Sequence, residues 1–254
     1  MTPSDLGPMP TEVEVWQRGR NSELGLALAF QLGAFVLATA AITPFVSSGG
    51  QLKPGIGGVL VGLIAAWPVL AAGVAFVARR RGVSWQTFVG APTIRAADLG
   101  MIIVGVALQF AVGVAYYLVG TDDTKVSAPA RELTARTGGL GLTFVVLAVF
   151  LVVGAPVFEE LFYRGLVLNA FMRAFRVEPT TARPTMGLVG AVGASALWFG
   201  LIHFQLLQLP ALVFVGLACA LARLKTGRIF TSICLHAGFN LATVVALGAQ
   251  LARS

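Results

Sequence analysis

The chain has 254 residues, of which 57% are hydrophobic and only 11% are charged, and its mean hydropathy is +0.84. A soluble domain of this length would be about one-quarter charged, so the composition excludes an ordinary soluble protein. The formal net charge is +7, from 18 Lys and Arg against 11 Asp and Glu. Because the basic residues lie in short segments between apolar runs, they indicate membrane topology, and we expect no nucleic-acid partner.

Seven apolar segments predict an all-α bundle of transmembrane helices, because each run is continuous and most are near the length that a helix needs to cross a bilayer. A transmembrane barrel would instead show alternating apolar and polar residues over about ten positions. Residues 1–23 are polar and proline-containing, and predict a cytoplasmic segment without a cleavable signal peptide. The predicted spans are 24–47, 56–78, 99–120, 142–172, 187–206, 210–224 and 229–250.

Two segments depart from a simple crossing. The fourth is too long, and we expect Pro156 to kink it just before a pair of glutamates. If this segment forms two helices, the bundle has eight spans. Residues 84–96 place Trp85 and Ile94 among polar side chains, and predict either an interfacial helix or an ordinary loop.

The distribution of basic residues predicts the orientation. With the N-terminus in the cytoplasm, the inner segments are richer in Lys and Arg than the outer ones, as the positive-inside rule requires. The inner segments hold Arg18, Arg20, Arg79, Arg80, Arg81, Arg95, Arg173, Arg176, Arg183, Arg223, Lys225 and Arg228. The outer segments hold Lys53, Lys125, Arg131, Arg136 and Arg253. The excess of Arg over Lys, with abundant Ala and Gly, favours a bacterial protein of the cell membrane.

The only two histidines of the chain lie inside apolar segments. His203 closes the sequence FGLIH, which begins at Phe199, and His236 opens HAGFN, which ends at Asn240. Residues four apart share a helix face, so each histidine lies on the same face as its companion. A single membrane histidine is most simply explained by a hydrogen bond between helices. Two such motifs in the half that also carries paired glutamates favour a polar site.

A third apolar segment carries EELFYR, with Glu159, Glu160 and Arg164. A charge at the bilayer centre costs about 2.5–3.5 kcal/mol on insertion scales. Glu160 and Arg164 are four apart, with the glutamate first, which favours an ion pair. Glu159 points about 100° away and lacks this partner. Apolar surroundings disfavour the ionised carboxylate and so make it a better proton acceptor, as a general base at neutral pH needs to be. Glu159 is therefore the candidate base. The alternative is that all three residues form a structural ion-pair cluster.

Together the three motifs resemble those of the CPBP family, whose pattern is EExxxR, FxxxH and HxxxN or HxxxD on three helices. EELFYR, FGLIH and HAGFN are complete and in this order. The family includes type II CAAX prenyl proteases and bacteriocin-processing and self-immunity proteins. The resemblance implies an intramembrane endopeptidase whose catalytic core is residues 142–250, whereas the helices of 24–141 carry no family motif.

The resemblance also implies roles for these residues. Glu159 and His203 would activate a water for attack on a peptide carbonyl. His236 and Asn240 would bind the developing oxyanion, where a lost donor typically costs about 10²–10³-fold in rate. The implied supporting residues are Glu160, Arg164 and Phe199.

The cofactor stays open between two alternatives. Two histidines and a glutamate could hold zinc, in which case the ligands would be His203, His236 and Glu159. The chain has no HExxH motif, and these ligands would come from three separate helices. We therefore favour a mechanism without a metal.

Two other functions could use the same residues. A scaffold or regulator of a partner membrane protein would use the cavity for binding, and a small transporter would use the ion pair as a proton relay. The intact set of four catalytic residues favours the enzyme, and the lack of a repeat between the two halves argues against the transporter. The expected partners are membrane lipid and a peptide or protein substrate, and the sequence does not fix the oligomeric state.

The positions of the two histidines set a geometric requirement. At 1.5 Å per residue, His236 lies about 10 Å from the inner start of its span, and His203 about 24 Å from a start at Gly187. The two imidazoles can share a level only if the crossing of span five begins nearer Gly193. We expect that arrangement, with a site in the inner half of the membrane that is open to the cytoplasm.

Overall fold

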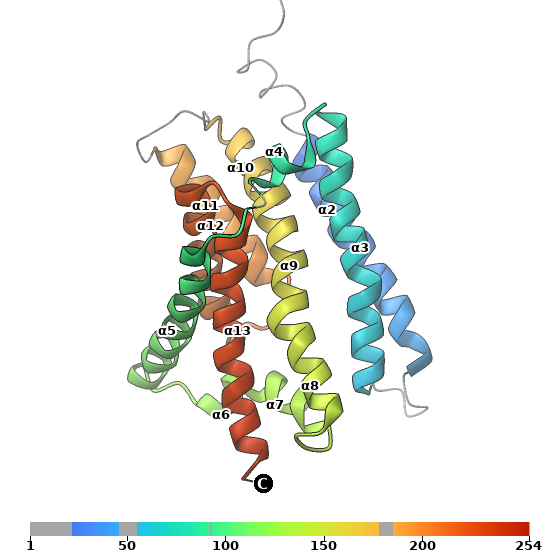
Figure 1. The fold of residues 1–254 in the computed structure, drawn as a ribbon, viewed down its shortest axis with the longest axis vertical. Coiled ribbons are helices and arrows are strands. Elements are labelled where there is room, and N and C mark those ends of the chain that lie inside the picture. The colour runs from blue at the N-terminus through green and yellow to red at the C-terminus, as the bar shows by residue number, and fades with distance from the viewer. Residues whose placement is uncertain (1–21, 46–54, 92, 178–184, 254) are drawn as a thin grey trace, which may run out of the picture.

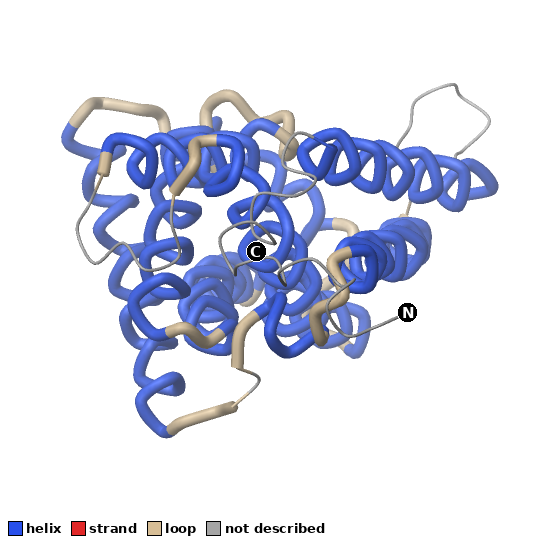
Figure 2. The backbone as a smooth tube through the Cα atoms, turned by 90° about the horizontal axis from the view of Figure 1, so that it is seen from above, coloured by secondary structure: helices blue, strands red, loops and turns tan. Residues whose placement is uncertain are grey.

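The computed structural model of the chain describes residues 22–45, 55–91, 93–177 and 185–253. Over these residues the only regular structure is helical, and the helices lie side by side in a bundle (Figures 1 and 2). This confirms the all-α prediction. The cytoplasmic segment predicted for residues 1–23 lies almost wholly outside the described residues.

The first part of the bundle holds three long helices and several short ones. Its elements are α2 (Ser22–Ile42), a 3-10 turn (Thr43–Phe45), α3 (Ile56–Arg80), α4 (Trp85–Val89), α5 (Ala96–Leu118), α6 (Asp123–Val126) and α7 (Ala128–Ala135). The second part begins with one long helix made of α8 (Leu142–Val149), a π-helical segment (Phe150–Gly154), α9 (Ala155–Glu160), a second π-helical segment (Leu161–Val167) and α10 (Leu168–Ala174). It ends with α11 (Met186–Leu201), α12 (Leu209–Thr226) and α13 (Ile229–Leu251).

Each of the seven predicted spans corresponds to a helix. Six helices are long and apolar enough to cross a membrane, and α11 is a shorter apolar helix of 16 residues. The fourth span is one continuous run of 33 residues, Leu142–Ala174, so it does not form two crossings. The chain is therefore a multi-pass membrane protein with seven apolar helices in its described part.

The segment at 84–96 is neither a full interfacial helix nor a simple loop. Its helix, α4, has only five residues, and Phe88 and Val89 are buried. Side chains from two other helices bind its backbone: Arg223 Nε donates to Val89 O at 3.0 Å, and Asn169 Nδ2 donates to Phe88 O at 3.2 Å. These contacts hold α4 against the protein.

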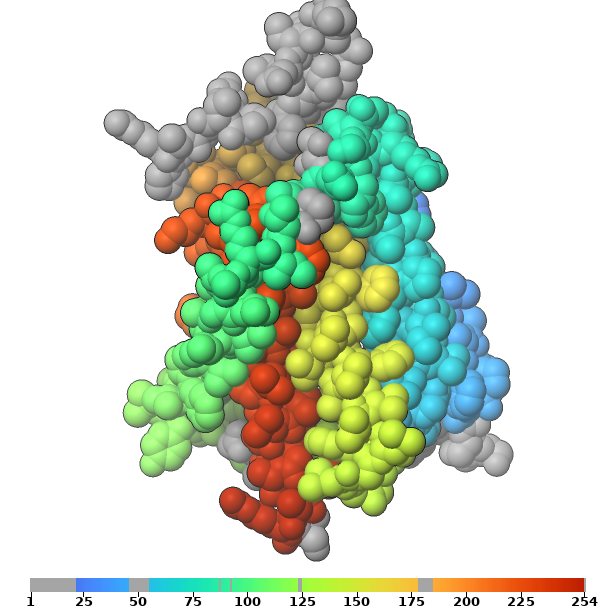
Figure 3. All heavy atoms as spheres, viewed as in Figure 1, coloured from blue at the N-terminus to red at the C-terminus, as the bar shows by residue number. Residues whose placement is uncertain are grey.

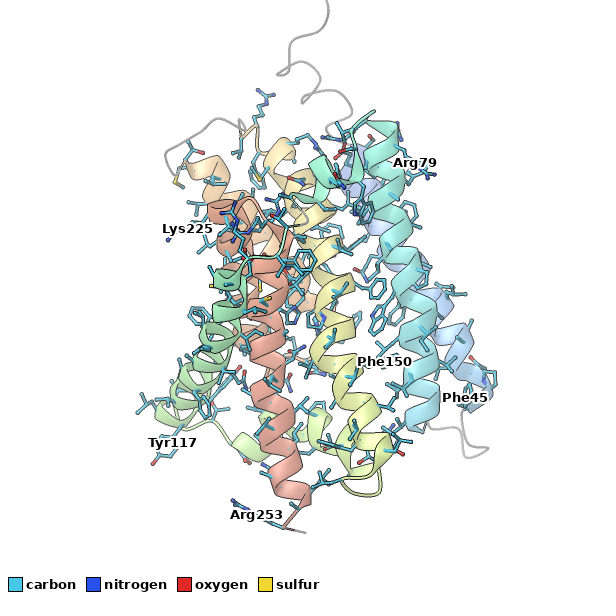
Figure 4. The ribbon with its side chains drawn as sticks, viewed as in Figure 1. Phe45, Arg79, Tyr117, Phe150, Lys225 and Arg253 are labelled. Carbon is cyan, nitrogen blue, oxygen red and sulfur yellow. The ribbon has the colours of Figure 1, made fainter. Side chains whose placement is uncertain are left out.

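Among the described residues, those labelled from the predicted inner segments lie at the opposite end of the bundle from those labelled near the predicted outer segments, whereas Arg18, Arg20, Lys53 and Arg183 lie outside the described residues. Figure 4 places Arg79 and Lys225 at one end and Tyr117 and Arg253 at the other. Arg173 differs from the prediction, because it is 1% exposed and forms an ion pair with the buried Glu23. It therefore stabilises contact between α10 and α2, and does not act as an exposed topology signal.

Helix α13, which carries His236 and Asn240, is held closely against α5. Figure 3 shows α13 (red) packed between α5 (green) and the α8–α10 helix (yellow). A Cβ added to Gly105 of α5 would lie 2.0 Å from Leu235 O, and one added to Gly238 of α13 would lie 2.1 Å from Ile102 O. Small residues allow such close approach of membrane helices, so these two glycines fix the level of α13 against α5.

The start of α13 is also tied to α5 by a buried carboxylate. Asp98 is fully buried and accepts hydrogen bonds from Arg228 Nη2 and from Thr231 Oγ1, both at 2.6 Å. Charge-assisted hydrogen bonds of this kind are stronger than neutral ones. Together with the glycine contacts, they make α5 and α13 a rigid support for one side of the site.

Candidate active site

The two glutamates lie on a helix in which two π-helical segments interrupt the α-helical pattern. The short α-helical stretch α9, which ends at Glu160, is flanked by the π-helical segments Phe150–Gly154 and Leu161–Val167. Phe150, at the start of the first segment, is labelled in Figure 4. Single π-helical turns within α-helices are rare and are frequent at functional sites. The first of them ends two residues before Pro156, where the sequence predicted a kink.

Glu160 forms the centre of a buried polar cluster. Its side chain is fully buried, and Oε2 lies 3.0 Å from Arg164 Nε, which confirms the ion pair expected from the spacing. Arg164 is 1% exposed; its Nη2 donates to Gly216 O of α12 at 3.2 Å, and its guanidinium lies 5.0 Å from the ring centroid of Phe199. The pair therefore joins α9 to α11 and α12.

His236 connects the two glutamates. Its Nδ1 lies 2.9 Å from Glu160 Oε1, and its Nε2 lies 3.9 Å from Glu159 Oε2. A hydrogen bond at one imidazole nitrogen fixes the ring orientation and decides which nitrogen faces the site. Nδ1 is held by Glu160, so Nε2 is the atom that faces Glu159.

Glu159 and Glu160 have different surroundings, as the sequence predicted. The Glu159 side chain is 20% exposed, whereas that of Glu160 is 0% exposed. Among the described residues, the side chain that lies at ion-pair distance from Glu159 is His236, which carries a charge only when its ring is doubly protonated. Glu159 is thus the carboxylate of the pair that can meet a water or a substrate.

Phe199 lies between the two histidines. Its ring centroid is 4.9 Å from that of His203 and 5.6 Å from that of His236, with edge-on geometry in both cases. Its backbone carbonyl lies 2.8 Å from His203 Nδ1. The three helices therefore bring FGLIH, HAGFN and EELFYR to one place, as the resemblance implied.

The prediction that His203 lies within a helix is wrong. Helix α11 ends at Leu201, five residues before the predicted end at 206, and His203 lies in the following turn. Phe204 has φ 54°, a left-handed conformation that ends helices. No glycine or proline follows Leu201 closely enough to mark this end, so the apolar run alone predicted a longer helix.

The ring contact between Phe199 and His236 relates the levels of α11 and α13. Phe199 lies about 20 Å along α11 from Met186, and His236 about 10 Å along α13 from Ile229. Because these two rings are in contact, α11 begins about 10 Å farther out than α13 does, at the end of the bundle where Lys225 lies. By the same count, α13 begins near the level of Gly193, and the start of the crossing there stays a prediction.

Contacts that the sequence did not reveal hold the turn after α11. Tyr116 OH of α5 donates to Leu207 O at 2.7 Å, and Gln208 Nε2 donates to Val126 O at 2.6 Å. The rings of Phe204 and Phe35 of α2 lie 5.9 Å apart. These long-range contacts fix the turn in which His203 lies, and no local sequence pattern indicates them.

Asn240, the remaining predicted site residue, has a backbone partner. Its Nδ2 donates to Leu151 O, in the first π-helical segment, at 2.8 Å. Asn240 and His236 are four residues apart on α13, so both reach from one face of that helix to the glutamate helix. Its predicted role as an oxyanion donor stays a prediction.

The predicted alternative metal site is not assembled in this arrangement. Within the described ranges, no three His, Cys, Asp or Glu side chains are grouped closely enough to hold a metal ion. Nδ1 of each histidine already has a protein partner. A mechanism without a metal stays a prediction.

Comparison with known families matches residues 141–242 to the family model described as type II CAAX prenyl endopeptidase Rce1-like. Over these residues, which are less than half of the chain, the sequence is similar to that family. The matched region contains all three motifs and thus confirms the resemblance to CPBP intramembrane proteases. No curated protein and no solved structure matches the chain. The Rce1-like family model implies a protease.

Proposed function

We propose that the chain is an intramembrane endopeptidase that cleaves a membrane-associated peptide with a water activated by side chains. The observation that supports this most directly is the position of His236, which is held by the buried Glu160 and faces the partly exposed Glu159. A purely structural ion-pair cluster would have no need of a second glutamate outside the Glu160–Arg164 pair. The Rce1-like domain supports the same conclusion.

In the proposed reaction, Glu159 takes a proton from a water that His203 helps to orient. The water oxygen attacks the peptide carbonyl carbon, and the carbonyl electrons move onto its oxygen. His236, with both ring nitrogens protonated, donates from Nε2 to that oxyanion, and Glu160 stabilises the positive ring through Nδ1. When the carbon–nitrogen bond breaks, Glu159 returns the proton to the leaving amine.

The proposed substrate is a short hydrophobic segment near the C-terminus of a membrane-associated peptide. Prenylated CAAX peptides are the eukaryotic substrates implied by the family resemblance, and for a bacterial protein we propose the peptide class alone. We place the protein in the cell membrane of a bacterium, with the N-terminus and the open side of the site in the cytoplasm. We further propose that no metal takes part.

A comparison of membrane peptides tests this function. Cells that produce the wild-type chain should contain cleaved peptides that are absent from cells producing equal amounts of Glu159→Gln, which should accumulate the uncleaved precursors. Mass spectrometry of membrane fractions measures both pools, and cells without the protein serve as the control. Identical peptide pools in all three would contradict the protease and favour the scaffold alternative.

Two matched lysines test the orientation. Lys125 of α6 and Lys225 of α12 are both exposed and lie in segments assigned to opposite sides of the membrane. We expect Lys125→Cys to react with an impermeant thiol reagent added to intact cells, and Lys225→Cys to react only after permeabilisation. The unmodified chain, whose Cys219 is buried and Cys234 half-buried, is the control. The opposite pattern of labelling would show that the charge bias misassigns the two sides.

A further inference from the structure

We infer that Asn240 is a positioning residue whose amide replaces a backbone donor that Pro156 removes from the glutamate helix. Its bond to Leu151 O would thereby hold Glu159 and Glu160 in register with His236. The contact stands on the geometry alone, whereas its consequence for turnover rests on the proposed function.

The carbonyl of Leu151 lacks its usual partner in the helix. In an α-helix it would accept from the N–H of Ala155, and in a π-helix from that of residue 156. Ala155 N–H is bonded to Phe150 O, and Pro156 has no N–H. Asn240 Nδ2 donates to Leu151 O at 2.8 Å and so satisfies a carbonyl that would otherwise lose its hydrogen bond.

Asn240 and His236 together form a two-point attachment between α13 and the glutamate helix. One bond joins His236 to Glu160 and the other joins Asn240 to Leu151, at 2.9 and 2.8 Å. The two attachment points lie about 6 Å apart along α13. A single bond would let one helix rotate or slide past the other, whereas two bonds at different levels fix both movements.

The opposite face of the same π-helical segment is also held. A Cβ added to Gly154 would lie 2.4 Å from Cη2 of Trp67 of α3. The Trp67 ring stacks on Phe150 at 5.3 Å and on Phe158 at 4.9 Å between centroids. The segment is thus enclosed by Trp67 on one side and bonded to Asn240 on the other, directly before the glutamates.

This role makes a prediction that a direct oxyanion role does not. If Asn240 compensates for Pro156, then a residue with an N–H at position 156 should reduce the need for the asparagine. If Asn240 instead donates to the reacting carbonyl, the residue at position 156 should not alter the cost of losing it.

The test combines Asn240→Ala with Pro156→Ala in the full-length chain. Thermal unfolding of the purified protein in detergent needs no substrate. We expect Asn240→Ala to lower the melting temperature by roughly 5 °C when Pro156 is present, and by less than half of that when position 156 is alanine. Thr243→Ala, on the same helix and bonded only to Phe239 O in its own helix at 3.4 Å, is the matched control and should show no such coupling.

Turnover of a substrate peptide is then measured on the same four proteins. Pro156→Ala alone should keep most of the wild-type turnover, since Asn240 and Trp67 still hold the segment. Asn240→Ala should lose about 10²-fold, and the double variant should regain most of that loss.

The outcomes separate the possibilities. An equal loss of melting temperature in both backgrounds would overturn the inferred contact, and an inactive Pro156→Ala would show that the proline itself sets the register. If the loss of melting temperature depends on the residue at position 156 but the loss of turnover does not, Asn240 would act as an oxyanion donor in the reaction. If neither the wild type nor any variant cleaves a peptide, the proposed function fails. The comparison of melting temperatures still tests whether Asn240 compensates for Pro156.

Discussion

Replacing Glu159 by glutamine should abolish proteolysis and leave the amount of folded protein in the membrane unchanged. Glu159 is the proposed base, and a positioned general base typically contributes about 10²–10⁴-fold to a rate. Its removal should not destabilise the fold, because His236 keeps its bond to Glu160 and no buried charge loses its counter-ion. Turnover of the purified protein and its melting temperature measure the two effects separately.

The matched control for this variant is Glu132→Gln. Glu132 pairs with Arg136 at 2.9 Å on an exposed surface. The substitution therefore removes one carboxylate of the same type outside the three motifs. An exposed pair contributes only about 0–1 kcal/mol, so both turnover and melting temperature should stay near the wild-type values. Undiminished turnover in Glu159→Gln would remove Glu159 from the mechanism.

The fold could be predicted from the sequence because its elements follow from local patterns. Continuous apolar runs identified the six described helices that are long enough to cross a bilayer and the shorter α11, and the spacing of Glu160 and Arg164 identified their ion pair. The contact between α5 and α13, which depends on Gly105 and Gly238, could not be predicted in this way. Which two helices a small residue brings together is a long-range property.

The sequence predicted which residues belong to the candidate site better than it predicted how they are arranged. The spacing of FGLIH placed His203 one turn beyond Phe199 on a continuing helix, whereas α11 ends at Leu201 and the turn after it is held by residues of other helices. The π-helical segments are hidden for the same reason. The first of them is contacted by Trp67 and Asn240, which are remote in sequence from it.

The buried pair beside the base should behave in the opposite way to Glu159. Glu160→Ala leaves Arg164, which is 1% exposed, without its counter-ion, and Arg164→Ala leaves a fully buried carboxylate. Breaking a buried ion pair from one side typically costs about 3–5 kcal/mol. Either variant should therefore lower the folded amount in membranes as well as proteolysis, as measured by quantitative blotting and thermal unfolding.

The double variant Glu160→Gln with Arg164→Met separates stability from catalysis. Each single variant leaves one buried charge without its partner, whereas the double variant leaves neither charge, so its folded amount should lie above that of either single variant. Proteolysis should not return, because the neutral amide at position 160 no longer stabilises the positively charged ring of His236, which the proposed mechanism requires at the oxyanion. Wild-type turnover in this double variant would show that Glu160 serves only to neutralise Arg164, and that His236 works without a carboxylate at its Nδ1.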